Sequence, residues 1–146
     1  MTPPTREIIS AIVDESFIFR SLDEEIRAQL KAKAHSCSFS AGEVIIEEGD
    51  EGTEMMIVNS GTVQVRQSSY RGEVSLAELG KRAVIGEVSV ITGTPRTSTV
   101  IAKDDVSVIC FSRETIQSII ASSPRVKKLL LKLIESRALQ SIDATH

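Results

Sequence analysis

The chain has 146 residues, of which 41% are apolar and 25% are charged, and its formal net charge is −3. This is enough chain for one domain with a single core, and so small a negative charge gives no general attraction to nucleic acid or anionic lipid. The N-terminal MTPPTREIIS lacks the basic start and apolar run of a signal peptide, and no apolar stretch reaches the length of a membrane helix, so we expect one cytoplasmic domain over residues 1–146.

An N-terminal helical region is predicted over residues 1–37. Apolar residues fall at helical spacing in Arg6–Asp14. A second helix is expected after Ser21, because Ser21 and Glu24 have the form of a capping box and apolar residues then repeat every four positions as far as Leu30.

A β region is predicted over residues 38–111, where the apolar period changes to two. Turn residues such as Gly49-Asp50 separate the apolar runs. Short strands at regular spacing are typical of a sandwich or a barrel-like roll. The expected strands are Val44–Ile46, Met55–Val58, Val63–Val65, Val74–Leu79, Thr99–Ala102 and Val106–Phe111.

Residues 112–146 are predicted to be helical again. One helix follows Ser112, and Pro124 interrupts the pattern because proline disfavours helix for the residue before it. A last helix is expected from Arg125 to about Ser141.

The most informative segment is Ile85–Val100, IGEVSVITGTPRTSTV, in which an arginine stands nine residues after the glutamate of a Gly-Glu turn. Backbone N–H groups at the start of a short helix attract a phosphate, and one arginine can add a forked, charge-assisted contact. The segment resembles the phosphate-binding cassette of cyclic-nucleotide-binding domains, the family of catabolite activator protein and of protein kinase A regulatory subunits. Phe39–Gly61 resembles the opening strands of that family, with their Gly-Asp turn and hairpin glycine.

The resemblance implies an α+β fold. Its centre would be a β-roll, a jelly-roll-like double-stranded β-helix, over residues 38–111, with the phosphate-binding cassette at residues 85–99. N-terminal helices and a C-terminal hinge helix would flank the roll.

The resemblance also implies a set of ligand-binding residues. Arg96 would neutralise the single charge of a cyclic phosphodiester, which a fixed guanidinium fork holds better than a mobile ammonium. Glu87 would accept a hydrogen bond from the ribose 2′-OH, and backbone N–H groups of its neighbours would bind phosphate and sugar. Outside such a site, Arg96 would be a surface arginine after a turn proline, and Glu87 a first-turn glutamate that complements the helix dipole. The implied ligand-binding set is Gly86, Glu87, Val88, Ser89, Arg96 and Thr97.

The choice between adenine and guanine falls on Thr97. In the family, alanine often occupies this position where adenine is preferred, whereas a hydroxyl there can bond the 2-amino group of a syn guanine. Some cyclic-AMP binders also carry a hydroxyl, and one such contact contributes only about 0.5–1.5 kcal/mol. We favour cyclic AMP over cyclic GMP as the ligand.

The last helix is the expected lid over the purine, with Leu129, Leu130 and Leu133 as candidates. As an alternative, these leucines face the β-roll as core or pack on another chain. The positions Val126, Leu130, Leu133 and Arg137 are candidates for the seam of a parallel homodimer, as in the activator branch of the family.

Neither an enzyme nor a metal site is expected. His35 and His146 are the only histidines of the sequence, and His35-Ser36-Cys37 alone is too sparse for a site that needs three or four ligands. Cys37 and Cys110 lie in strand-like alternation, where reduced buried thiols are usual. The sequence lacks the G-x-S-x-G and G-x-x-x-x-G-K elements, so we expect no catalytic residues and no cofactor apart from the ligand.

These features predict a free-standing receptor module for a cyclic mononucleotide. The chain after Pro124 has room for one helix, so neither the helix-turn-helix of related transcription factors nor a nucleic-acid partner is expected. Ligand would draw the cassette inward, and the last helix would close about Pro124 and change contacts with a protein partner, regulated in trans, that the sequence does not identify. The alternative is a constitutive adaptor with the same fold that binds no nucleotide, against which the intact Glu87 and Arg96 argue.

Overall fold

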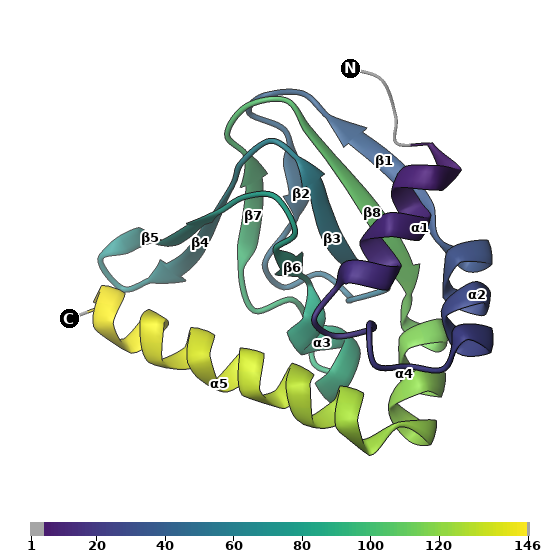
Figure 1. The fold of residues 1–146 in the computed structure, drawn as a ribbon. Helices are drawn as coiled ribbons and strands as arrows, with labels where there is room; N and C mark the ends of the chain where they lie inside the picture. The colour runs from purple at the N-terminus through teal and green to yellow at the C-terminus, as the bar shows by residue number, and fades with distance from the viewer. Residues whose placement is uncertain (1–4, 146) are drawn as a thin grey trace.

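Two four-stranded antiparallel sheets form the body of the fold, with helices along one side and one end (Figure 1). The computed structural model describes residues 5–145, with side chains described for residues 5–136. One sheet has the strand order β1-β8-β3-β6, and the other has the order β2-β7-β4-β5. The strands are β1 (His35–Phe39), β2 (Val44–Ile46), β3 (Glu54–Ser60), β4 (Val63–Ser69), β5 (Gly72–Leu79), β6 (Val84–Ile85), β7 (Thr99–Ala102) and β8 (Val106–Ser112). The predicted α+β class and β-roll are confirmed.

Strands β3 and β8 are buried on both faces, which explains their nearly continuous apolar runs. Successive side chains of a strand point to opposite faces, so each strand serves two separate cores. One core lies between the two sheets, and the other lies between the β1-β8-β3-β6 sheet and the helices. The first receives Met56, Val58, Val108 and Cys110, and the second receives Met55, Ile57, Ile109 and Phe111.

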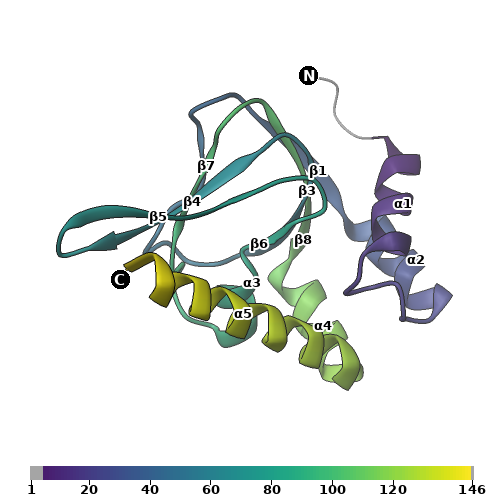
Figure 2. The ribbon, with the colours of Figure 1, turned by 60° about the vertical axis from the view of Figure 1, so that its left-hand side comes forward.

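The helices are α1 (Arg6–Glu15), α2 (Glu24–Lys33), α3 (Glu87–Thr92), α4 (Arg113–Ser122) and α5 (Pro124–Thr145). Helices α1 and α2 pack side by side, and Asp14 of α1 pairs with Lys31 of α2 at 2.9 Å. Figure 2 shows α5 running below the roll from α4 to the β4–β5 hairpin. Within residues 5–145, the structure contains no helix with the length and apolarity needed to cross a membrane.

The start of α2 differs from the sequence prediction. Asp23, not Ser21, is the N-cap, and its side chain makes no capping hydrogen bond. Residues 17–21 form turns instead, and these turns bury Ile18 and Phe19 completely. The ring of Phe19 meets that of Phe111 edge-on, with centroids 5.3 Å apart. Because the turns place Ile18 and Phe19 in the core, helix α2 begins only at Glu24.

The other boundaries agree with the sequence within a few residues. Ser112 caps α4 through its side chain, which accepts from the backbone N–H of Thr115. Pro124 is the first residue of α5, where its missing N–H costs nothing. Strand β1 begins at His35, three residues before the predicted β region, and neither β1 nor the two-residue strand β6 was among the expected strands.

Candidate functional site

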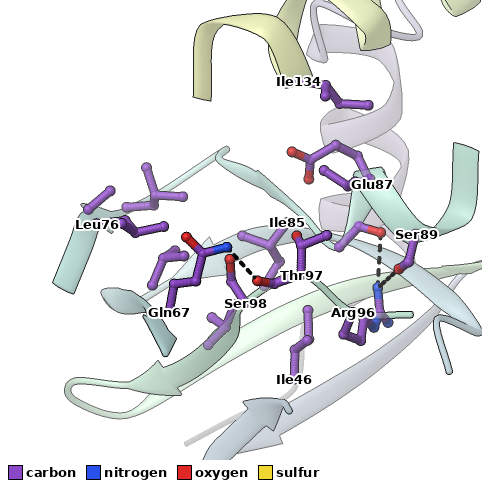
Figure 3. A pocket seen from close by; sticks show the side chains of 16 residues that line it. Ile46, Gln67, Leu76, Ile85, Glu87, Ser89, Arg96, Thr97, Ser98 and Ile134 are labelled. Atoms are coloured by element: carbon purple, nitrogen blue, oxygen red, sulfur yellow. Dashed lines mark hydrogen bonds between the residues drawn. The ribbon is translucent and has the colours of Figure 1, made fainter. Parts of the chain in front are cut away.

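A cavity of about 380 Å³ lies between the β2-β7-β4-β5 sheet, α3 and α5 (Figure 3). This volume is within the range of small-molecule sites, roughly 300–1000 Å³. All six residues of the predicted ligand-binding set line it. The segment that the sequence singled out therefore forms one wall of a real cavity.

The lining combines polar and apolar side chains. The polar lining residues are Gln67, Glu87, Ser89, Arg96, Thr97 and Ser98. The apolar lining residues are Ile46, Val65, Leu76, Ala77, Leu79, Ile85, Val88, Val100 and Ile134. Such a cavity suits a ligand that carries both a charged group and a flat or apolar part.

Arg96 is fixed by both its backbone and its side chain. Its N–H donates to the carbonyl of Asp50 at 2.7 Å, and its own carbonyl accepts from Gly49 at 2.8 Å. Its side chain is buried, and Nη1 donates to the carbonyl of Gly86 and to Oγ of Ser89, each at 2.9 Å. Its Nη2 donates to the carbonyl of Glu54 at 2.8 Å. The guanidinium is thus held in place before any ligand arrives.

Burial lowers the pKa of Arg96 below its ordinary value, and the negative charges of Glu54, Glu87 and Asp50 act in the opposite direction. An arginine does not lose its proton in proteins, so the cavity contains a buried positive charge. A desolvated cation interacts more strongly with an anion than an exposed one does. The cavity can therefore hold an anionic group beside Arg96.

Two observations favour glycine at residue 86. It is the N-cap of α3 with φ of 77°, in the left-handed region. A Cβ added there would lie 2.7 Å from Nη1 of Arg96 and 3.0 Å from the carbonyl oxygen of Glu54. The glycine therefore both permits the turn into α3 and leaves space for the guanidinium.

Gly52 has a similar role that the sequence analysis missed. A Cβ at this residue would lie 2.0 Å from Oγ of Ser89, the group that accepts from Arg96. The residue stands in an acidic turn that carries no signal of a binding site. Only the fold brings this turn against α3.

The remaining cassette residues occupy different environments. Glu87, the first residue of α3, is only 2% exposed, and Figure 3 shows its carboxylate extending into the cavity on the side of Ile134. Ser89 is equally buried, and Val88 is half-buried. Thr97 is exposed at the rim, and its carbonyl accepts from Nε2 of Gln67 at 3.0 Å. Buried Glu87 and exposed Thr97 therefore offer oxygen atoms at two depths of the site.

The leucines expected to form the lid do not line the cavity. Leu130 is fully buried in the core beside the helices, Leu133 packs against that core, and Leu129 is half-buried. Ile134 is the residue that α5 contributes to the cavity lining. Leu130 and Leu133 therefore face the protein core, as the alternative interpretation expected.

Positions proposed for the dimer seam are also buried inside this chain. Val126 and Leu130 are fully buried within the chain's own core, so they are not available to a second chain. The side chain of Arg137 lies outside the described residues. The structure thus gives no support to a seam made of these positions.

Several lining residues come from elements with no sequence signal for a site, among them Gln67 on β4, Leu76 on β5 and Ile134 on α5. In the sequence they belong to an ordinary β-hairpin and an amphipathic helix. Their position over the cassette depends on how the hairpin and α5 fold over it, and local patterns do not report that.

Comparison with known proteins agrees with this geometry. The family model described as cyclic nucleotide-binding domain matches residues 36–123. The cyclic nucleotide-gated channel beta-3 of Mus musculus is 30% identical over 129 residues, which are 86% of this chain and 18% of the channel. The cAMP-dependent protein kinase regulatory subunit of Dictyostelium discoideum is 28% identical over 130 residues, 88% of this chain and 40% of that subunit.

A solved structure extends the comparison to three dimensions. The crystal structure of a cyclic nucleotide-binding domain from Methylobacillus flagellatus superposes with a TM-score of 0.74 and 26% identity, covering 94% of this chain and 80% of that one. The chain spans less than half the length of the two curated relatives named above. The matched family model, the β-roll and the cassette that lines its cavity together show that the chain belongs to the cyclic nucleotide-binding domain family.

Proposed function

We propose that the chain is a receptor module that binds a cyclic mononucleotide, with cyclic AMP favoured over cyclic GMP, in the 380 Å³ cavity. The observation that carries the proposal is the buried guanidinium of Arg96 in the wall of a cavity whose lining is mostly apolar. A cyclic nucleotide has the matching distribution, with one anionic phosphodiester and one flat base.

Each part of the ligand has a complementary group. The phosphodiester pairs with Arg96, and the ribose 2′-OH donates to the carboxylate of Glu87. The base lies against the apolar walls, between Leu76 of the hairpin and Ile134 of α5. Charge-assisted bonds fix the orientation of the ligand, and burial of the base adds affinity.

The preference for cyclic AMP has two supports. The Dictyostelium relative is by name a cAMP-dependent regulatory subunit. Thr97 is exposed at the rim, where water competes for its hydroxyl, so its contribution to guanine recognition is small.

The output of binding is a change in α5. This helix contacts α3, α4 and β5, and it contributes Ile134 to the cavity. A ligand that contacts Ile134 favours the arrangement in which α5 covers the cavity, because a ligand shifts an equilibrium only by its differential affinity for the two states. The exposed face of α5, which includes Leu131, then presents a changed surface to a protein partner regulated in trans.

One observation favours a second candidate, a constitutive adaptor that binds no nucleotide. Three N–H groups of Arg96 already donate to protein acceptors, so the arginine also has a purely structural role. In the adaptor, Arg96 would hold Glu54, Gly86 and Ser89 together and nothing else.

Isothermal titration with cyclic AMP and cyclic GMP separates the two candidates. The receptor binds with a Kd in the micromolar range, about −8 kcal/mol. Arg96→Ala removes charged hydrogen bonds of about 1.5–3 kcal/mol each, so loss of two weakens binding by roughly a hundredfold or more. Thr97→Ala leaves cyclic AMP affinity within about threefold and weakens cyclic GMP.

Two further variants test whether the loss of affinity is specific to the guanidinium fork of Arg96. Arg96→Lys keeps the charge without the fork and gives an intermediate affinity, whereas Arg71→Ala, exposed on the hairpin and outside the cavity, leaves affinity unchanged. Circular dichroism verifies that each variant is folded. If the unmodified chain gives no heat and no thermal shift at millimolar concentrations of either nucleotide, the receptor is excluded and the adaptor remains.

A further inference from the structure

Outside the cavity, strands β1 and β8 bring three metal-ligating side chains together. In the antiparallel register His35 lies opposite Cys110, and Cys37 lies two residues further along the same face of β1. The donor atoms of these three side chains all lie within 4.8 Å of one another. Both cysteines are free thiols. Cys110 is 73 residues away from Cys37 in the chain, so the sequence pattern showed only His35 and Cys37 together.

We propose that His35, Cys37 and Cys110 form a binding site for a divalent zinc ion. Thiolate sulfur and imidazole nitrogen are the donors that zinc prefers, whereas calcium and magnesium require oxygen. Three protein ligands with water in the fourth position complete a tetrahedral site. Nothing in this site overlaps the lining of the nucleotide cavity.

The separation of the sulfur atoms supports this assignment. Sγ of Cys110 lies 3.8 Å from Sγ of Cys37. Two thiolates on one tetrahedral zinc, each at about 2.3 Å, are separated by about 3.8 Å. A disulfide requires about 2.05 Å, so the thiols would have to move to form one, whereas they already have the spacing for a shared ion.

A carboxylate orients the histidine. Oε2 of Glu54, on β3, lies 2.9 Å from Nε2 of His35. Histidines bound to zinc commonly donate their second N–H to a carboxylate, which fixes the ring and raises its basicity. With Nε2 engaged by Glu54, Nδ1 is the nitrogen that binds the ion.

The exposure of the three ligands increases from Cys110 through Cys37 to His35, so an ion can enter from solvent on the side of His35. Cys110 is fully buried, Cys37 is half-buried, and His35 is exposed. The ion therefore has an open side for entry and for the water ligand, while the buried sulfur shields the other side. A thiol that merely filled the core would need neither an exposed imidazole nor a carboxylate beside it.

The test uses the reduced full chain and Co²⁺ as a spectroscopic substitute for Zn²⁺. The chain is stripped with a chelator, kept in a phosphine reductant and shown by thiol titration to carry two free thiols. Addition of Co²⁺ produces a near-ultraviolet thiolate-to-cobalt charge-transfer band that saturates at about one ion per chain, and Zn²⁺ then abolishes the band.

Variants identify the ligands. Cys37→Ser and His35→Ala each weaken binding tenfold or more, and Glu54→Gln weakens it about 10- to 100-fold as an orienting residue does. Ser38→Ala, an exposed neighbour on the same strand, leaves the band unchanged. Cys37 is chosen over Cys110 because the latter is fully buried and its replacement risks the fold.

The proposal is overturned by a reduced chain with two free thiols that shows no charge-transfer band at millimolar Co²⁺. It is also overturned if the band persists with unchanged affinity in both Cys37→Ser and His35→Ala. Neither result depends on nucleotide binding, so the outcome is independent of the receptor proposal.

Discussion

Replacement of Gly86 by alanine tests how Arg96 is held. The left-handed backbone at this residue costs alanine about 1–2 kcal/mol. The new Cβ would also lie 2.7 Å from Nη1 of Arg96, which must then move away from its acceptors, the Gly86 carbonyl and Ser89. A hydrogen bond to a charged group contributes about 1.5–3 kcal/mol. With at least one such bond lost, Gly86→Ala lowers the free energy of unfolding by about 2.5–5 kcal/mol.

Gly93→Ala is the matched control. Gly93 is the C-cap of the same helix with φ of 74°, but a Cβ there meets no atom within 4 Å. This variant therefore loses only the backbone term, about 1–2 kcal/mol. Urea unfolding of both variants gives the difference directly, and titration with cyclic AMP shows whether affinity falls only in Gly86→Ala. Equal destabilisation of the two variants would refute the argument that Gly86 makes room for the guanidinium.

Three further substitutions extend the test to the rest of the site and the core. Ser89→Ala removes an acceptor of Arg96 and lowers the free energy of unfolding by about 1.5–3 kcal/mol in urea; no change would mean that the bond is not made in solution. Ile134→Ala removes apolar surface over the base, at about 0.8 kcal/mol per methylene, and weakens cyclic AMP binding about 5- to 30-fold by titration, while the exposed Leu131→Ala does not. Phe111→Ala opens the core beside the helices and destabilises by about 3–5 kcal/mol, measured by the same unfolding assay; a loss below about 1 kcal/mol would contradict its burial.

The β-roll was predictable because its signals are local. The run MMIV in β3 is apolar throughout, and the run VSVICF in β8 is apolar except for Ser107, which indicates burial on both faces; turn residues mark the ends of both runs. The cassette was equally visible, since its glycine, glutamate and arginine have a fixed spacing in the chain. The predicted set around Arg96 lines the cavity because one short helix and one loop supply all of it.

Contacts between distant segments were not predictable. The carbonyl of Glu54 accepts from Arg96 across 42 residues of chain, and no pattern around Glu54 indicates it. The pairing of β1 with β8 likewise brings Cys110 beside His35. A backbone carbonyl or a lone cysteine carries no sequence signal of its partner, so only the folded structure reveals these neighbours.

Helix α5 illustrates why periodicity alone could not identify the residue that reaches the cavity. Val126, Leu130 and Leu133 recur at intervals of four and three and form one stripe, which faces the core beside the helices. Ile134 follows Leu133 directly, so it lies about 100° further round the helix and reaches the cavity. An apolar stripe predicts that a helix has a buried face, but it does not say whether that face meets a protein core or a ligand. Adjacent sides of α5 contact the core and the cavity. Which residue lies on which side therefore became clear only from the position of the helix against β5 and α3.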